Sequence, residues 1–298
     1  MSGSGTARRS AILKALFAVA VWGASFIATK IALAEAAPVT VVWLRFAMGV
    51  AVLGAIVAWR RQLTLPSASD LAYLTLLGCL GITLHQWLQS NGLVTSQAST
   101  TAWIVASAPV FMAVLGWLVL SERVRPLAVA GMAVAALGVL TVVSRGDLTA
   151  LASRRFGTPG DLLILASAPN WAVFSVLSRR GLRRFPAGWM MFWVMTTGWL
   201  LTSALFLLTG PGPADIGRLT GRGWAAVVFL GLCCSGLAYA FWFDALRELP
   251  SSQAGALLYL EPLVTVAVAA ALLGEPIALA TLAGGVAILL GVWMIERR

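Results

Sequence analysis

The sequence predicts an all-α integral membrane protein with ten transmembrane helices, arranged as two inverted five-helix repeats. Three observations lead to this fold class. Hydrophobic residues make up 60% of the 298-residue chain and charged residues only 11%. Ten apolar runs follow one another along the chain, and the second half of the sequence matches the first half in register.

The composition excludes a soluble enzyme and a disordered protein. A soluble domain is roughly 45–50% apolar and about 25% charged, and the mean hydropathy of this chain is +0.90. So little charge could not keep so much apolar surface dissolved. A polytopic helical membrane protein is therefore the class that the composition favours.

Ten apolar runs set the expected spans. A helix crosses the bilayer core of roughly 30 Å with about 20 residues. The runs are continuously apolar, without the alternation of barrel strands, so we expect helices. Their approximate bounds are 11–34, 39–60, 70–90, 98–120, 127–143, 161–180, 187–209, 223–245, 254–273 and 279–295.

The distribution of Lys and Arg predicts the orientation. With the N-terminus in the cytoplasm, 14 of the 21 Lys and Arg residues fall on the inner side and five on the outer side. Basic residues accumulate on the cytoplasmic side of membrane proteins, so we expect both termini inside. The same bias explains the net charge of +10 without a nucleic-acid partner.

An internal repeat divides the chain into two halves. A shift of 153 residues places Pro262 on Pro109, and a shift of 149 places Trp171 on Trp22. Because each half has five spans, the second half enters the membrane from the opposite side. Secondary transporters have this architecture, with a substrate site near the midplane. The predicted units are a first repeat over 11–143, a linker loop over 144–160 and a second repeat over 161–295.

Three segments carry a resemblance to a known family. The first span contains AVWGASFIATKIAL, spans four and five contain TTAWIVASAPVFMAVLGWLVLSERVRPLAVAGMAVAALGVLTV, and spans nine and ten contain SSQAGALLYLEPLVTVAVAAALLGEPIALATLAGGVAILLGVWMI. This pattern resembles the paired EamA repeats of the drug/metabolite transporter superfamily, and among them it is most similar to the YddG-type amino-acid exporters. The resemblance implies an exporter in the inner membrane of a bacterial-type cell. It also implies a central cavity lined mainly by spans 1, 3, 4, 6, 8 and 9.

Aromatic and small polar side chains on these spans are the first candidates for a binding site. Polar residues inside a bilayer usually face protein or water, and tryptophans on such stripes would form flat walls around a small organic solute. The alternative is that these tryptophans fill space or anchor the interface. The substrate-binding candidates of this kind are Trp22, Trp103, Ser107, Asn170 and Trp171.

A second set of candidates is polar or titratable. His85 and Gln89 share a face of span 3, and a histidine could bind a carboxylate or relay a proton. Glu261 lies within span 9 beside Tyr259, and Tyr239 lies on span 8. A carboxylate within a span is a functional candidate by default, although Glu261 could instead be a structural hydrogen-bond acceptor. His85 could equally be a hydrogen-bonded packing residue.

Other residues suggest hinges and scaffold. Prolines remove backbone hydrogen bonds within spans, so we predict hinges at Pro109, Pro169 and Pro262. Lys30 and Arg45 are expected near the outer ends of spans 1 and 2, where their charged groups would extend to the interface or pair with Glu35. The Gly-rich spans 5 and 10 are expected to form scaffold or the face of a homodimer.

The sequence thus predicts a secondary transporter that exports amino acids, including aromatic ones, or similar small metabolites by alternating access. Export of drugs, purines or other metabolites is the alternative within the class, and a membrane enzyme or structural subunit is the alternative outside it. No nucleotide-binding, catalytic or metal motif is present, so we expect no enzyme activity and no cofactor. The expected partners are a small solute and the lipid bilayer.

Overall fold

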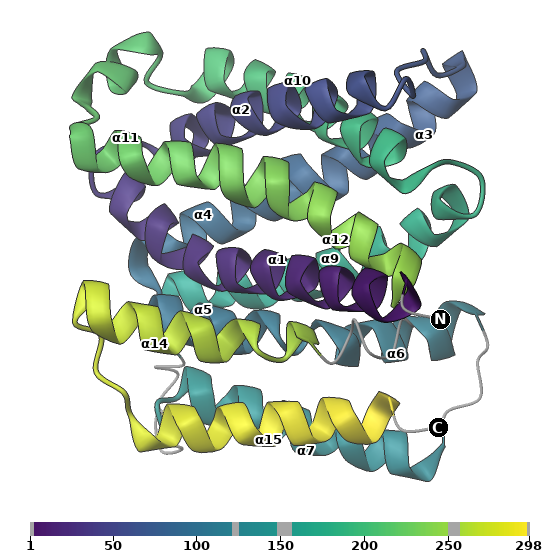
Figure 1. Cartoon of the computed structure of the whole chain (residues 1–298). Helices are drawn as coiled ribbons and strands as arrows, with labels where there is room; N and C mark the ends of the chain where they lie inside the picture. The colour runs from purple at the N-terminus through teal and green to yellow at the C-terminus, as the bar shows by residue number, and fades with distance from the viewer. Residues whose placement is uncertain (1–2, 121–124, 148–156, 250–256, 297–298) are drawn as a thin grey trace.

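The fold is a bundle of long helices, shown here by a computed structural model that describes residues 3–120, 125–147, 157–249 and 257–296. Every regular element in these ranges is a helix. The helices run side by side across Figure 1, with both chain ends on the right and the α14–α15 turn on the left. We call these two ends of the bundle the termini face and the opposite face.

The first half supplies five spans, of which the third and fourth are each made of more than one element. They are α1 (Gly3–Leu33), α2 (Pro38–Trp59), α3 (Ala68–Gly78) with η1 (Cys79–Leu84) and α4 (His85–Thr95), α5 (Ala98–Val105) with α6 (Ala108–Leu120), and α7 (Pro126–Val143).

The second half follows the same order. Its elements are α9 (Pro159–Leu182), α10 (Ala187–Thr209), the short 3₁₀ helix η2 (Pro213–Arg218), α11 (Gly221–Val228) with η3 (Phe229–Leu237) and α12 (Ala238–Glu248), α14 (Glu261–Leu273), and α15 (Leu279–Glu296).

Helix starts follow from local sequence. Thr158 and Asp161 form a capping box at the start of α9, and the Ser67 side chain accepts a hydrogen bond from the backbone N–H of Asp70 at the start of α3. Such caps satisfy backbone N–H groups that have no partner within the helix. Pro38 and Pro126 occupy first-turn positions, where a missing N–H costs nothing.

The predicted fold class is confirmed. Within the described residues, eight helices are long and apolar enough to cross a membrane, and the apolar helices Glu261–Leu273 and Leu279–Ile295 are shorter. Together they correspond to the ten expected spans. Residues 148–156 of the predicted linker and 254–256 of the ninth predicted span lie outside the described residues.

Both halves carry irregular helix at equivalent places, which the hydropathy pattern does not reveal. The third span contains the π-helical segment η1, and the eighth contains η3; a shift of 153 residues places η1 inside η3. A turn at Ala106–Ser107 separates α5 from α6, and a turn at Tyr259–Leu260 precedes α14. π-Helical segments are frequent at functional sites, so these interruptions direct attention to the spans that contain them.

Helices α7 and α15 pack mainly against each other at one edge of the bundle (Figure 1). A Cβ atom on Gly138 would lie 2.6 Å from the carbonyl oxygen of Gly284, and one on Gly131 would lie 2.6 Å from that of Gly291. Only glycine permits such close backbone contact. The scaffold interpretation of spans 5 and 10 agrees with this packing, whereas the homodimer face stays a prediction.

Polar contacts close the opposite face, and they correct one expectation. Lys30 does not pair with Glu35: its Nζ donates to the carbonyl oxygens of Leu93, at 3.2 Å, and of Ser96. Glu35 instead accepts from the backbone N–H and the hydroxyl of Thr220 at 2.7 and 2.8 Å. The Lys30 ammonium is hydrogen-bonded to carbonyl oxygens at the end of α4, so it holds spans 1 and 3 together.

Candidate functional site

Two rings from the two halves contact each other in the interior of the bundle. The imidazole of His85, at the start of α4, lies 4.8 Å from the ring of Trp171 on α9, and Trp171 in turn lies 4.9 Å from Phe174. His85 is 6% exposed and its Nδ1 has no hydrogen-bond partner. The structure therefore brings together two predicted site residues and leaves a polar atom of one of them unsatisfied.

A second aromatic group joins α1 to the eighth span. The ring of Trp22 lies 5.4 Å from that of Tyr239 and 5.4 Å from that of Trp242. Its indole Nε1 donates to the carbonyl oxygen of Cys234 at 3.1 Å. Cys234 belongs to the π-helical segment η3, so this segment offers a carbonyl to a predicted site residue.

The equivalent π-helical segment in the first half makes a similar contact. The side-chain amide of Asn170 on α9 donates to the carbonyl oxygen of Leu80, in η1, at 2.8 Å. Asn170 and Trp171 are adjacent, so one contacts η1 while the other contacts His85. Gln89 is buried one helical turn beyond His85 on α4. Each half thus places an irregular backbone segment beside aromatic side chains of the other half.

Arg45 is the site residue that sequence reasoning placed wrongly. It does not extend to the interface: only 8% of it is exposed, and it lies seven residues into α2, about 10 Å along the helix axis. Its Nε donates to the hydroxyl of Ser235 at 2.8 Å, and its Nη1 donates to Oε1 of Gln86 at 3.3 Å. The sequence did contain a signal of this buried position, because Arg45 follows the start of the span at Pro38 by seven residues, which is too far for an interfacial side chain.

Glu261 lies at the first position of α14, after the turn at Tyr259–Leu260. The hydroxyl of Thr265 donates to the carbonyl oxygens of both Glu261 and Gly23, at 3.0 and 2.8 Å. A Cβ on Gly23 would lie 2.8 Å from the Glu261 carbonyl, so α1 and α14 touch here. Glu261 is therefore next to the helix that carries Trp22. Tyr259 packs against the hydrophobic cluster that contains Phe26 and Trp103.

Trp103 and Ser107 lie apart from these groups. Trp103 on α5 is 1% exposed and covers α15, because a Cβ on Gly285 would lie 2.5 Å from its ring. The hydroxyl of Ser107 donates to the carbonyl oxygen of Ile104 at 2.6 Å, within the turn between α5 and α6. The structure thus does not bring Trp103 together with Trp22 or Trp171. Their role in solute binding stays a prediction.

The three predicted hinge prolines differ in their setting. Pro109 and Pro262 are each the second residue of a helix that follows a turn, whereas Pro169 lies inside the unbroken helix α9. A proline in the first turn of a helix costs no backbone hydrogen bond. Pro109 and Pro262 therefore mark the ends of interrupted segments, and hinge motion at any of the three stays a prediction.

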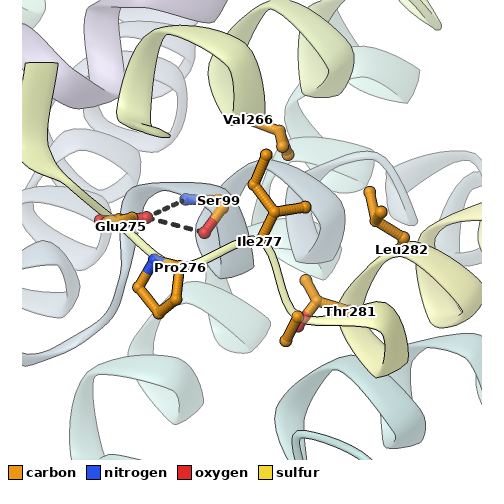
Figure 2. A pocket seen from close by; sticks show the side chains of 8 residues that line it. Ser99, Val266, Glu275, Pro276, Ile277, Thr281 and Leu282 are labelled. Carbon is orange, nitrogen blue, oxygen red and sulfur yellow. Dashed lines mark hydrogen bonds between the residues drawn. The ribbon is translucent and has the colours of Figure 1, made fainter. Parts of the chain in front are cut away.

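Two pockets on the outside of the bundle contain none of the predicted site residues. One lies at the α14–α15 turn, where the Glu275 carboxylate accepts from the backbone N–H of Ser99 at 3.1 Å and from its hydroxyl at 2.7 Å (Figure 2). The other lies between Pro38 on α2 and Thr202 on α10. Figure 2 shows the Glu275 carboxylate pointing at Ser99, so it caps the start of α5.

The interior arrangement is suited to binding rather than to covalent chemistry. It offers aromatic faces, a guanidinium, a carboxylate and an imidazole in a buried environment. Among the described residues, no group of three or more His, Cys, Asp or Glu side chains could hold a metal ion. Buried charges inside a membrane protein mark substrate or ion pathways.

Comparison with known proteins agrees with this arrangement. The model of the EamA-like transporter family matches residues 9–144 and again residues 158–297. An uncharacterized transporter of Archaeoglobus fulgidus is 29% identical over 92% of this chain and 93% of its own. A solved structure with 22% sequence identity superimposes with a TM-score of 0.68, covering 96% of this chain and 98% of the other.

Two relatives have names that state a substrate. A protein of Streptantibioticus cattleyicolor named "probable terminal-alkyne amino-acid exporter" is 30% identical over 78% of this chain and 75% of its own. A protein of Salmonella typhimurium named "probable amino-acid metabolite efflux pump" is 26% identical over 94% of this chain and 92% of its own.

Proposed function

Because this chain belongs to the EamA-like transporter family, we propose that it exports amino acids or closely related metabolites by alternating access. The solute would bind between the two halves, beside Trp22, His85, Trp171 and Tyr239. No bond of the solute would be made or broken. The orientation with both termini in the cytoplasm is part of the same proposal.

The main support for the proposal is that side chains of both halves contact each other in the interior of the bundle. His85 and Arg45 from the first half contact Trp171 and Ser235 from the second half. A site shared by two repeat units is where a rocking motion of one unit against the other would open first to one side and then to the other. The export of amino acids is supported by the names of the two relatives given above.

Counterflow in liposomes tests the proposal. Purified protein is reconstituted into vesicles loaded with one unlabelled amino acid, and uptake of the labelled form is followed. We expect exchange for at least one amino acid, with aromatic ones included in the panel. Exchange limited to purines or to drug-like cations, with no amino acid active, would contradict the substrate class. Protein-free vesicles are the control.

A further inference from the structure

Arg45 carries a buried positive charge that the protein itself does not neutralise. Among the described residues, no carboxylate lies within 4.0 Å of its guanidinium, whose contacts are the uncharged Ser235 and Gln86. By contrast Arg60, which directly follows α2 at the termini face, pairs with Asp244 at 2.9 Å. An unpaired charge in a membrane interior is energetically unfavourable, so its retention calls for a transient anionic partner.

Glu261 is the matching acidic side chain. In the described part of the chain, no hydrogen bond or ion pair reaches its carboxylate; the contacts that hold the residue use its backbone carbonyl. It lies at the start of α14, directly after the interruption of the ninth span. Like the Arg45 guanidinium, its carboxyl group has no oppositely charged partner among the described residues.

A short chain of contacts links both residues to Trp22. Arg45 binds Ser235, which follows Cys234, the acceptor of the Trp22 indole. Trp22 precedes Gly23, whose backbone touches that of Glu261. Tyr239 and Cys234 each interact electrostatically with both Arg45 and Glu261. Arg45 and Glu261 form no ion pair with each other, so neither side chain neutralises the other.

We propose that Arg45 and Glu261 bind the two charged ends of a zwitterionic solute. The guanidinium would take the α-carboxylate, for which its planar fork is suited, and the Glu261 carboxylate would take the α-ammonium. Trp22 and Tyr239 would cover the part between them. This inference rests on the proposed function and narrows its substrates to amino acids whose carboxylate and amino group are both free.

Competition binding on the purified protein in detergent tests the assignment. The probes are L-phenylalanine, L-phenylalaninamide and 3-phenylpropionate, and the corresponding alanine series of L-alanine, L-alaninamide and propionate. We expect the protein to bind the zwitterion of at least one series tenfold or more tightly than the amide or the deaminated acid, because each lacks one charge-assisted contact.

Substitution of each charge then separates the two contacts. Arg45→Gln should reduce the preference for the amino acid over its amide to within about twofold, while the affinity for the amide itself stays unchanged. Glu261→Gln should remove the preference over the deaminated acid instead. Arg45→Lys keeps the charge without the fork and should retain part of the first preference. Arg60→Gln, directly after the end of α2, is the matched control and should retain both preferences.

Three outcomes would overturn the inference. The first is that Arg45→Gln still binds the amino acid more tightly than its amide. The second is that a variant with the same gel-filtration profile as the wild type no longer binds any of the three probes of a series. The third is that the wild type shows no preference for the zwitterion. The last result leaves export itself intact if another metabolite exchanges in counterflow. Absence of all exchange in that assay would instead overturn the proposed function.

Discussion

Four buried side-chain polar atoms of the described residues have no hydrogen-bond partner, and two of them, His85 Nδ1 and Trp103 Nε1, belong to predicted site residues. Leaving a buried donor or acceptor unsatisfied costs about 1–3 kcal/mol, so each needs a reason. His85 contacts Trp171 in the group shared by both halves, where a solute could complete its hydrogen bonding. Trp103 packs on Gly285 within a hydrophobic cluster, where the area it buries outweighs the lost hydrogen bond.

At the residue scale we predict that His85 contributes to solute binding rather than to energy coupling. His85→Gln keeps a polar group of similar reach, so it should retain part of the downhill flux, whereas His85→Leu should lose most of it. Flux is measured in liposomes with and without an imposed pH gradient. If the wild type concentrates solute when driven by protons, and His85→Gln abolishes only that accumulation, His85 is a coupling residue and the prediction fails.

At the element scale the interrupted spans contrast with the pair α7 and α15. The third and eighth spans contain π-helical segments whose carbonyls accept from Asn170 and Trp22. The helices α7 and α15 are continuous and make glycine-to-carbonyl contacts that leave no room for a side chain. Irregular backbone at membrane depth is tolerated where protein covers it. In the proposed alternating access, the interrupted spans would move and the glycine-packed pair would stay fixed.

The close contact between α7 and α15 predicts that a larger residue at Gly284 lowers stability. Gly284→Ala would bring a methyl group to 2.8 Å from the Gly138 carbonyl oxygen, so the helices must separate. Overpacking of this kind lowers stability by about 1–3 kcal/mol. Thermal unfolding in detergent measures the effect. Gly188→Ala is the matched control: nothing lies within 4 Å of its added atom, and it should leave stability unchanged or raise it. Equal melting temperatures for both variants would contradict the packing argument.

At the scale of the whole molecule, the two ends of the bundle are held by different chemistry. The termini face has ion pairs, with Lys14 at 3.0 Å and Arg60 at 2.9 Å from the Asp244 carboxylate. The opposite face has carboxylates that accept from backbone N–H groups, such as Glu275 at the start of α5. In alternating access these two sets of contacts would break in turn.

The orientation in the membrane is tested by accessibility labelling. In a background without the three natural cysteines, a cysteine at Ser69, on the termini face, should react only after the membrane is permeabilised. A cysteine at Gly217, on the opposite face, should react in intact cells, because the distribution of basic residues predicts cytoplasmic termini. Both positions are exposed. Labelling of both from the same side would contradict the ten-span topology.

Much of the fold and part of the candidate site follow from the sequence. Hydropathy is a local property, so the positions of the spans could be predicted from runs of apolar residues. The matches of Trp22 with Trp171 and of Pro109 with Pro262 predicted related halves. The pairs His85–Trp171 and Trp22–Tyr239 lie among the predicted site residues, because polar and aromatic side chains inside a membrane face protein.

What the sequence by itself determined is therefore the class, the spans, the family resemblance and a set of candidate side chains. Only the tertiary structure decided which of them meet. Arg45 contacts Ser235, 190 residues away in the chain, whereas Trp103 turns to α15 and the third and eighth spans become π-helical. The physical reason is that hydropathy reports transfer from water to lipid residue by residue. Hydrogen-bond partners and helix faces depend on how distant spans pack.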